Sequence, residues 1–308
     1  MKINAVVVTY NRKYMLGDCL NAILAQTLPV DKIYVIDQHS TDSTEEYLLE
    51  KDFLKHPLID YRYMECNSGG AGGFHDGMKL AYENGADWIW VMDDDVIPEA
   101  NCLEELVIAN NVVGDKTASF FASSIRTHDG GAVNVPKISR NQFMKYTDWY
   151  EYLESGLAQI VKATFVSLLI NTEAVRKCGL PWAPFFIWGD DSEYTQRIIR
   201  DYGPAYMVGA SKAIHRRVRV KDLSIVQEMD LDRIDRYFYY YRNNLIGFWE
   251  YETPLYRFLC LGKLAYDFFT VLFKGKYKFR KMKVILKAFV NFAFGGYDRE
   301  SFRNRMNI

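Results

Sequence analysis

Three consecutive carboxylates, Asp93, Asp94 and Asp95, follow an apolar run at residues 88–92. Adjacent carboxylates repel one another, by roughly 1–4 kcal/mol for a close pair near a protein surface. A divalent cation removes this cost and can share its coordination sphere with phosphate oxygens. A solvated acidic turn would also explain the triplet, but its place at the end of an apolar strand favours a metal site. His215 is a candidate neutral ligand, although a lone histidine is more often structural.

A second acidic cluster, Asp190, Asp191 and Glu193, follows the apolar residues 185–188. If a helix begins near Asp190, then Asp190 and Glu193 share a face while Asp191 turns toward another. Acidic residues in a first helical turn are commonly only capping groups. The alternative is a general base beside Trp188, whose apolar wall would raise the pKa of that base.

Residues 67–77 contain five glycines. Glycine lets the backbone approach a ligand closely and adopt positive φ. The segment lacks the GxGxxG spacing of dinucleotide sites, and no phosphate-binding GxxxxGK[ST] motif occurs in the chain. A flexible turn is the simplest interpretation, but a helix beginning near Gly73 would direct amide groups and a positive dipole end at an anion.

Alternating strands and helices must position these residues. Apolar runs predict strands at residues 3–9, 33–37, 59–64 and 88–93, and helical spacing predicts helices at 13–26, 43–55 and 73–85. This order predicts an α/β fold with a mostly parallel sheet covered by helices on both faces. Ligands of such sheets bind beyond the carboxyl ends of the strands, where this chain places polar residues.

The second half of the chain is less regular. We expect strands at residues 118–125 and 160–170, a helix at 190–202, a strand at 205–208, and aromatic-rich helices from Leu231 onward. We therefore divide the chain into a catalytic domain, residues 1–222, and a C-terminal helical region, residues 223–308.

The composition of the 308 residues, 49% apolar and 25% charged, is that of a globular protein. It argues against a disordered chain and against a uniformly basic, nucleic-acid-binding one. The net charge of −1 conceals a division, because residues 255–308 carry 12 Lys and Arg against 3 Asp and Glu. The tail is therefore +9 and the rest of the chain −10.

The basic tail places lysines beside an aromatic helical face. This pattern fits a helix lying in a membrane interface, where each Lys or Arg near an anionic leaflet contributes about 1 kcal/mol. The alternative is a set of helices that pack on the body or form a homo-oligomer.

The five cysteines are scattered and show no CxxC spacing, which argues against a disulfide scaffold or a zinc site and for a reducing compartment. The apolar run at residues 5–8 is too short for a signal peptide, and no apolar stretch reaches 18 residues. We expect a cytoplasmic protein that is peripheral on the inner face of the cell membrane.

In combination, the segments TYNR, IDQHSTDST, NSGGAGGF, MDDD and WGDDSEY with a later histidine resemble the inverting glycosyltransferases of family 2, which have the Rossmann-like GT-A fold. The resemblance covers roughly residues 1–220. The forms NSGGAGGF, DDD and WGDDSEY are most similar to the galactofuranosyltransferase branch, whose outline rhamnosyltransferases largely share.

The resemblance implies a role for each matching residue. Donor binding is implied for four groups of residues. Thr9 and Arg12 would line the nucleotide pocket, with Asp37 and Gln38 near the base. The diphosphate and sugar would be approached by Asn67, Gly69, Gly70, Gly72 and Gly73, and Asp93 and Asp94 would also contact the donor. Asp93, Asp95 and His215 would hold Mn²⁺ or Mg²⁺. Asp191 would be the catalytic base, with Asp190 as the alternative base, and Trp188, Asp190 and Glu193 would contact the acceptor.

The implied reaction is metal-dependent transfer of galactofuranose from UDP-galactofuranose to a glycan or lipid-linked glycan of a bacterial surface polysaccharide. Two alternatives stay open: a rhamnosyltransferase that uses dTDP-rhamnose, and a non-catalytic scaffold that binds a nucleotide sugar. We expect no nucleic-acid partner, and a homo-oligomer is compatible with the sequence.

Overall fold

Four parallel strands form one half of a ten-stranded sheet in the computed structural model, which describes residues 1–114, 117–143, 145–216 and 223–295. These strands lie in the order β3-β2-β1-β4 and span β1 (Ile3–Thr9), β2 (Lys32–Asp37), β3 (Ile59–Tyr63) and β4 (Trp88–Asp93). The sheet continues through a mixed half, β11-β6-β12-β10-β7, and β5 pairs with β12. Its strands are β5 (Val96–Pro98), β6 (Phe120–Arg126), β7 (Lys137–Ile138), β10 (Leu157–Lys162), β11 (Leu168–Asn171) and β12 (Ala205–His215); β8 (Gln142–Phe143) and β9 (Tyr146–Thr147) form a separate hairpin.

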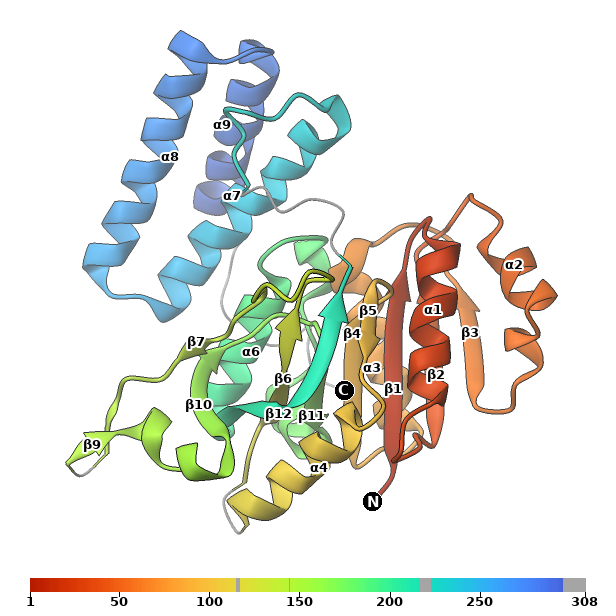
Figure 1. Ribbon diagram of the computed structural model, residues 1–308. Coiled ribbons are helices and arrows are strands. Elements are labelled where there is room, and N and C mark those ends of the chain that lie inside the picture. Colours follow the sequence, from red (N-terminus) through yellow and green to blue (C-terminus); the bar gives the residue numbers. More distant parts are fainter. Residues whose placement is uncertain (115–116, 144, 217–222, 296–308) are drawn as a thin grey trace.

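Helices cover both faces of the sheet, as the alternation predicts (Figure 1). One face packs against α1 (Lys13–Leu24), α2 (Thr44–Glu50) and α4 (Cys102–Val113), and the other against α3 (Gly69–Glu83), α5 (Thr172–Cys178) and α6 (Asp190–Asp201). In β1, Ala5 and Val7 join the first core while Val6 and Val8 join the second. Such two-sided burial explains the mostly apolar runs of β1, β2 and β4, whereas the edge strand β3 is partly exposed and carries Asp60 and Arg62.

A helical layer of α7 (Leu231–Tyr251), α8 (Pro254–Lys274) and α9 (Lys278–Phe294) lies beyond one end of the sheet (Figure 1). It has its own core, which includes Ile234, Val271 and Ile285. The predicted start at Leu231 is confirmed, and the Asp230 side chain caps the helix by accepting from the amides of residues 232 and 233. The predicted domain boundary at 222 lies at residues 217–222, outside the described residues.

Four predicted elements differ in kind or by more than two residues at one end. The strand expected at 205–208 continues to His215 as β12. The single strand expected at 160–170 is wrong: a turn at Ser167 (φ 59°) separates β10 from β11, and β6 and β12 lie between them in the sheet. The helix expected at 43–55 ends at Glu50, and Asp52 (φ 61°) then leads into a single 3₁₀ turn. Helix α3 begins at Gly69 rather than Gly73, so most of the glycine run is helical.

Candidate active site

Asp93, Asp95 and His215 come together at the carboxyl end of the sheet. Asp93 ends β4 and His215 ends β12, two strands that are not neighbours. The short strand β5, which follows Asp95, pairs antiparallel with the end of β12 and sets Val96 opposite His215. As a result, one ligand atom from each of Asp93, Asp95 and His215 lies within 4.8 Å of the others.

The hydrogen bonds of His215 prepare its ring to coordinate a metal. Its Nδ1 lies 2.9 Å from Oδ1 of Asn134, and its Nε2 lies 3.0 Å from Oδ1 of Asp95. If Nδ1–H donates to Asn134, then Nε2 carries a lone pair, and Asp95 Oδ1 is a buried acceptor without a donor among the described residues. Two acceptors that face each other fit a shared cation, and an outer hydrogen bond on Nδ1 is typical of a metal-bound histidine.

The middle carboxylate, Asp94, faces the protein interior. The Thr9 hydroxyl donates to it at 2.7 Å, and the Arg12 guanidinium donates at 3.1 Å while also reaching Asp95 at 2.8 Å. Burial raises the pKa of Asp94 to about 6 against the opposing charge of Arg12. Thr9 and Arg12 therefore support the triplet, and their contact with a nucleotide stays a prediction.

The pKa values of Asp93 and Asp95, the first and last carboxylates of the triplet, shift in opposite directions. Burial raises the pKa of Asp93 well above its ordinary value, and the charges of Asp95 and Asp94 raise it further. Burial also opposes ionisation of Asp95, but its pKa is lowered overall by His215, which in its protonated form would donate from Nε2 where no metal is bound, and by the charge of Arg12. Two carboxylates and one imidazole are a donor set that fits Mn²⁺, and Mg²⁺ with added oxygen ligands.

Asp37 and Gln38, at the end of β2, are buried within hydrogen-bond networks. The two oxygens of Asp37 accept from the backbone amide of Ser40 and the Tyr61 hydroxyl, both at 2.7 Å. Gln38 Oε1 accepts from the Ser68 amide and hydroxyl at 2.9 and 2.8 Å. Its Nε2 is a buried donor without a partner among the residues described.

The glycine run brings α3 close to two other segments. Asn67 Oδ1 accepts from the amide of Gly69 at 2.8 Å, and Gly69 has φ +75°. A Cβ at Gly69 would lie 2.0 Å from the Phe186 carbonyl oxygen, and a Cβ at Gly73 would lie 2.5 Å from the Val8 side chain. These two glycines therefore allow close packing within the protein itself.

The other two glycines of the predicted donor site differ in their surroundings. A Cβ at Gly72 would meet the Ser68 hydroxyl at 2.0 Å, whereas nothing lies within 4 Å of one at Gly70. Of the run, Gly70 has the most open surroundings, and the predicted approach of these glycines to a donor remains untested.

Asp190 and Asp191 begin α6, as predicted, and differ in environment. Burial and the charge of Asp191 raise the pKa of Asp190 to about 8. Burial also raises the pKa of Asp191, against hydrogen bonding from Ser192 and the charge of Lys162, which favour its ionised form. The charge of an ionised Asp190 contributes to the raised pKa of Asp93, which places Asp190 and the metal cluster within electrostatic reach of each other.

Glu193 is engaged by partners within the chain. The Arg197 guanidinium binds both of its oxygens, at 2.9 and 3.1 Å, and the Tyr251 hydroxyl donates to it at 2.7 Å. Glu193 and Arg197 are almost fully buried. This network joins α6 to α7 and leaves the acceptor contact predicted for Glu193 untested.

Trp188 packs toward the helical layer. Its ring centroid lies 5.3 Å from that of Tyr237 and 6.3 Å from that of Tyr240, both on α7. The high pKa of the neighbouring acid pair comes from burial, and a contact of Trp188 with an acceptor stays a prediction.

Three supporting residues contact partners that lie far from them in the sequence. Asn134 lies 81 residues from His215, and Tyr251 lies 58 residues from Glu193. Asn243, within the segment YYYRNN, lies 58 residues from the carbonyl of Phe185 to which it donates. Such distant pairings follow from the tertiary fold rather than from local spacing.

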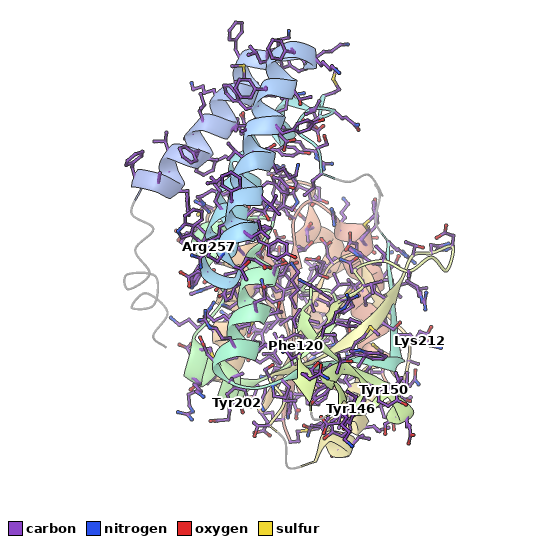
Figure 2. All side chains as sticks on the ribbon, turned by 90° about the vertical axis from the view of Figure 1, so that its left-hand side faces the viewer. Phe120, Tyr146, Tyr150, Tyr202, Lys212 and Arg257 are labelled. Atoms are coloured by element: carbon purple, nitrogen blue, oxygen red, sulfur yellow. The ribbon has the colours of Figure 1, made fainter. Side chains whose placement is uncertain are left out.

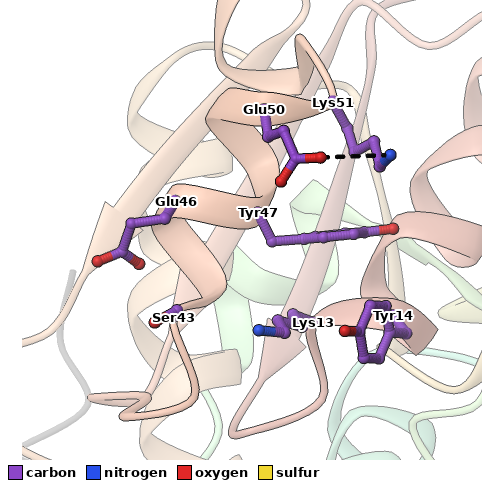
Figure 3. Close-up of a pocket in the computed structure, with 7 residues that line it drawn as sticks. All are labelled: Lys13, Tyr14, Ser43, Glu46, Tyr47, Glu50 and Lys51. Atoms are coloured by element: carbon purple, nitrogen blue, oxygen red, sulfur yellow. Dashed lines mark ion pairs between the residues drawn. The ribbon is translucent and has the colours of Figure 1, made fainter.

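A shallow hollow between α1 and α2 lies apart from these groups (Figure 3). It is lined by Lys13, Tyr14, Ser43, Glu46, Tyr47, Glu50 and Lys51. None of these is a predicted site residue, and Glu50 pairs with Lys51 at 3.7 Å. The hollow therefore adds nothing to the candidate site.

A galactofuranosyltransferase is among the similar proteins, and it matches just under two thirds of the chain. A galactofuranosyltransferase of Mycolicibacterium smegmatis, GlfT1, is 27% identical over 199 residues, which cover 64% of this chain and 65% of the relative. The match thus spans just under two thirds of that protein.

Solved structures show the same fold. Staphylococcus aureus TarS (residues 1–349, in complex with UDP) has a TM-score of 0.54 and 14% identity, covering 96% of this chain and 72% of that one. GalNAc-T7 with UDP, GalNAc and Mn²⁺ has a TM-score of 0.57 and 15% identity, covering 79% and 51%. The expected GT-A fold is confirmed. Because the model of the family described as "Glycosyl transferase family 2" matches residues 5–165, more than half of the 308, the chain belongs to glycosyl transferase family 2.

Proposed function

We propose that the protein is a metal-dependent inverting glycosyltransferase that moves galactofuranose from UDP-galactofuranose to a glycan or lipid-linked glycan. The observation that carries the proposal is the approach of Asp93, Asp95 and His215 to within 4.8 Å, in electrostatic reach of the buried acid pair on α6. The named galactofuranosyltransferase relative supports the choice of donor.

In this proposal Asp93, Asp95 and His215 hold Mn²⁺ or Mg²⁺, which when bound offsets negative charge on the departing diphosphate. Thr9 and Arg12 keep Asp94 in place beneath the site. The unpartnered Nε2 of Gln38, and the open backbone at Gly70, are offered to the donor.

Asp191 is the proposed general base. Asp190, whose pKa is about 8, is mostly protonated at neutral pH. Burial raises the pKa of Asp191 as well, but hydrogen bonding from Ser192 and the charge of Lys162 oppose that rise and favour its ionised form. An ionised Asp191 can take the proton from the acceptor hydroxyl as that oxygen attacks the anomeric carbon. A single displacement of this kind inverts that carbon.

Asp191→Asn tests the base. We expect transfer to be lost while UDP still binds in the presence of Mn²⁺, as measured by calorimetry. Asp190→Asn is the matched variant, and it should retain more transfer than Asp191→Asn. Near-full turnover by Asp191→Asn would show that another group is the base.

The helical layer supports a second part of the proposal, docking on an anionic membrane surface. Among the described residues, no helix is both long and apolar enough to cross a membrane. The connection from α8 to α9 exposes Phe273 (73%) and Phe279 (89%) beside the exposed Lys274, Lys276 and Lys278. Figure 2 shows the side chains of this layer spreading into solvent. Aromatic groups interleaved with lysines fit the interface of an anionic leaflet.

Vesicle flotation tests the docking. Replacing Lys274, Lys276 and Lys278 by glutamine should weaken binding to anionic vesicles by about a hundredfold, since each lysine contributes about 1 kcal/mol and tenfold corresponds to about 1.4 kcal/mol. The matched control replaces three exposed lysines of the catalytic half, Lys51, Lys55 and Lys79, by glutamine. Equal binding to neutral vesicles, or none to anionic ones, would contradict this part of the proposal.

A further inference from the structure

The turn at residues 185–189, which leads into the acid pair, has an unusual backbone. Phe186 (φ 61°), Trp188 (φ 62°) and Gly189 (φ 97°) all have positive φ. Bulky residues in this region cost of order 1–3 kcal/mol each and persist only where the surroundings impose them. Something outside the turn must therefore hold it.

The amide of Asn243, on α7, supplies much of that hold. Its Nδ2 lies 2.9 Å from the carbonyl oxygen of Phe185, 3.2 Å from that of Ile187 and 2.8 Å from that of Trp188. Asn243 is 2% exposed, so these bonds form away from water. With its two N–H groups, this one side-chain amide thus contacts three carbonyl groups of the turn, those of residues 185, 187 and 188.

Arg242 fixes the orientation of that amide. Its Nε and one terminal nitrogen donate to Asn243 Oδ1 at 3.0 and 2.8 Å, and the same terminal nitrogen donates to the Pro184 carbonyl at 2.5 Å. Because Oδ1 accepts from a guanidinium, Nδ2 must be the atom that faces the carbonyls. The guanidinium also lies over the rings of Phe238 and Tyr239, at 5.2 Å from each centroid.

The opposite side of the turn rests on α3. The amide of Ala71 donates to the Phe186 carbonyl at 3.1 Å, and Gly69 has no Cβ to obstruct that oxygen. The Gly189 carbonyl then accepts from the amide of Glu193 at 2.9 Å, within the first turn of α6. The turn is therefore held between α3 and α7, and its end is bonded to the helix that carries the acids.

We propose that Asn243 is a positioning residue: through its side-chain amide, α7 holds the 185–189 turn and fixes where α6 presents Asp190 and Asp191. The helical layer is then part of the active site and not solely a docking element. The catalytic consequence of this inference rests on the proposed function, whereas the hold on the turn does not.

Asn243→Asp is the sharpest test, because it keeps the shape of the side chain but removes both N–H donors. We expect kcat to fall about tenfold to a hundredfold, because small displacements of a reacting group have effects of that size. The donor KM and the affinity for UDP in the presence of Mn²⁺ should change by less than about twofold. Asn244→Asp is the matched control, since Asn244 Nδ2 donates to the Tyr240 carbonyl of its own helix.

Hydrogen exchange gives a readout that does not depend on activity. In Asn243→Asp the amides of residues 186–193 should exchange faster, while those of β1 and β4 keep their wild-type protection. Wild-type protection of 186–193, or a kcat within about twofold of wild type, would overturn the inference. Equal loss of protection in β1 and β4 would also overturn it, by showing a general loss of stability. If the wild type transfers no sugar, the proposed function fails and the exchange result still decides whether Asn243 holds the turn.

Discussion

Asp190→Asn should stabilise the protein against unfolding at neutral and alkaline pH but not in acid. Burial and the charge of Asp191 raise the pKa of Asp190 from 3.8 to about 8. Between those values the folded state keeps a proton that the unfolded state has lost. The free energy of unfolding therefore decreases as the pH rises through this window, and the asparagine variant lacks this dependence.

The size of the effect follows from the width of the window. Each pKa unit corresponds to about 1.4 kcal/mol, so the raised pKa of Asp190 alone would lower the free energy of unfolding of the wild type at pH 7 by about 4 kcal/mol relative to acid. Part of that cost belongs to the repulsion with Asp191, which titrates together with it. We therefore expect Asp190→Asn to gain about 2 kcal/mol at pH 7 and close to nothing at pH 4.

Urea unfolding followed by tryptophan fluorescence measures this difference. Wild type and variant are compared from pH 4 to 8 in EDTA, so that no metal contributes to stability. Asp52→Asn is the control, because Asp52 is exposed and an asparagine tolerates its φ of 61°. A difference that is constant with pH, or that grows toward acid, would refute the assignment of a buried, protonated Asp190.

Three further predictions concern the supports of the site. Arg197→Met leaves Glu193 buried without its counter-charge and should lower the free energy of unfolding by about 3–5 kcal/mol; an unchanged urea midpoint would contradict the buried pair. Asn134→Ala removes the outer partner of His215 and should weaken Mn²⁺ binding about 10–100-fold by calorimetric titration, so that wild-type affinity would argue against this role. Gly73→Ala sets a Cβ against Val8 and should destabilise the fold by about 1–3 kcal/mol, whereas Gly70→Ala, in open space, should not; equal effects would show that close packing is not the reason for the glycine.

Much of the fold follows from local pattern. Strands β1 and β4 have the predicted bounds, because a strand buried on both faces is apolar at nearly every position and ends where polar residues such as Thr9 and Asp93 begin. The strand predicted at 160–170 failed because apolar residues continue through a buried turn. Hydropathy does not distinguish such a turn from a strand, and a serine at position 167 does not predict the positive φ that this residue adopts.

Only part of the candidate site could be predicted from the sequence. Acidic residues at strand and helix ends identified both carboxylate clusters, because polar groups after apolar runs are a local signal. The pairing that brings His215 to Asp95 depends on β5, a strand of three residues. The sequence equally gave no indication that Glu193 would bind Arg197 and Tyr251, or that Gly69 and Gly73 would serve packing.

The most direct test of the proposed function is the release of nucleoside diphosphate from a panel of nucleotide sugars by the purified protein. The panel includes UDP-galactofuranose and dTDP-rhamnose, each with Mn²⁺ and with EDTA, and the variants Asp95→Asn and Asp191→Asn. We predict release from UDP-galactofuranose that requires Mn²⁺ and is lost in Asp95→Asn. Release that is equal in EDTA, or absent with every donor in the presence of acceptor glycans, would contradict a metal-dependent sugar transferase.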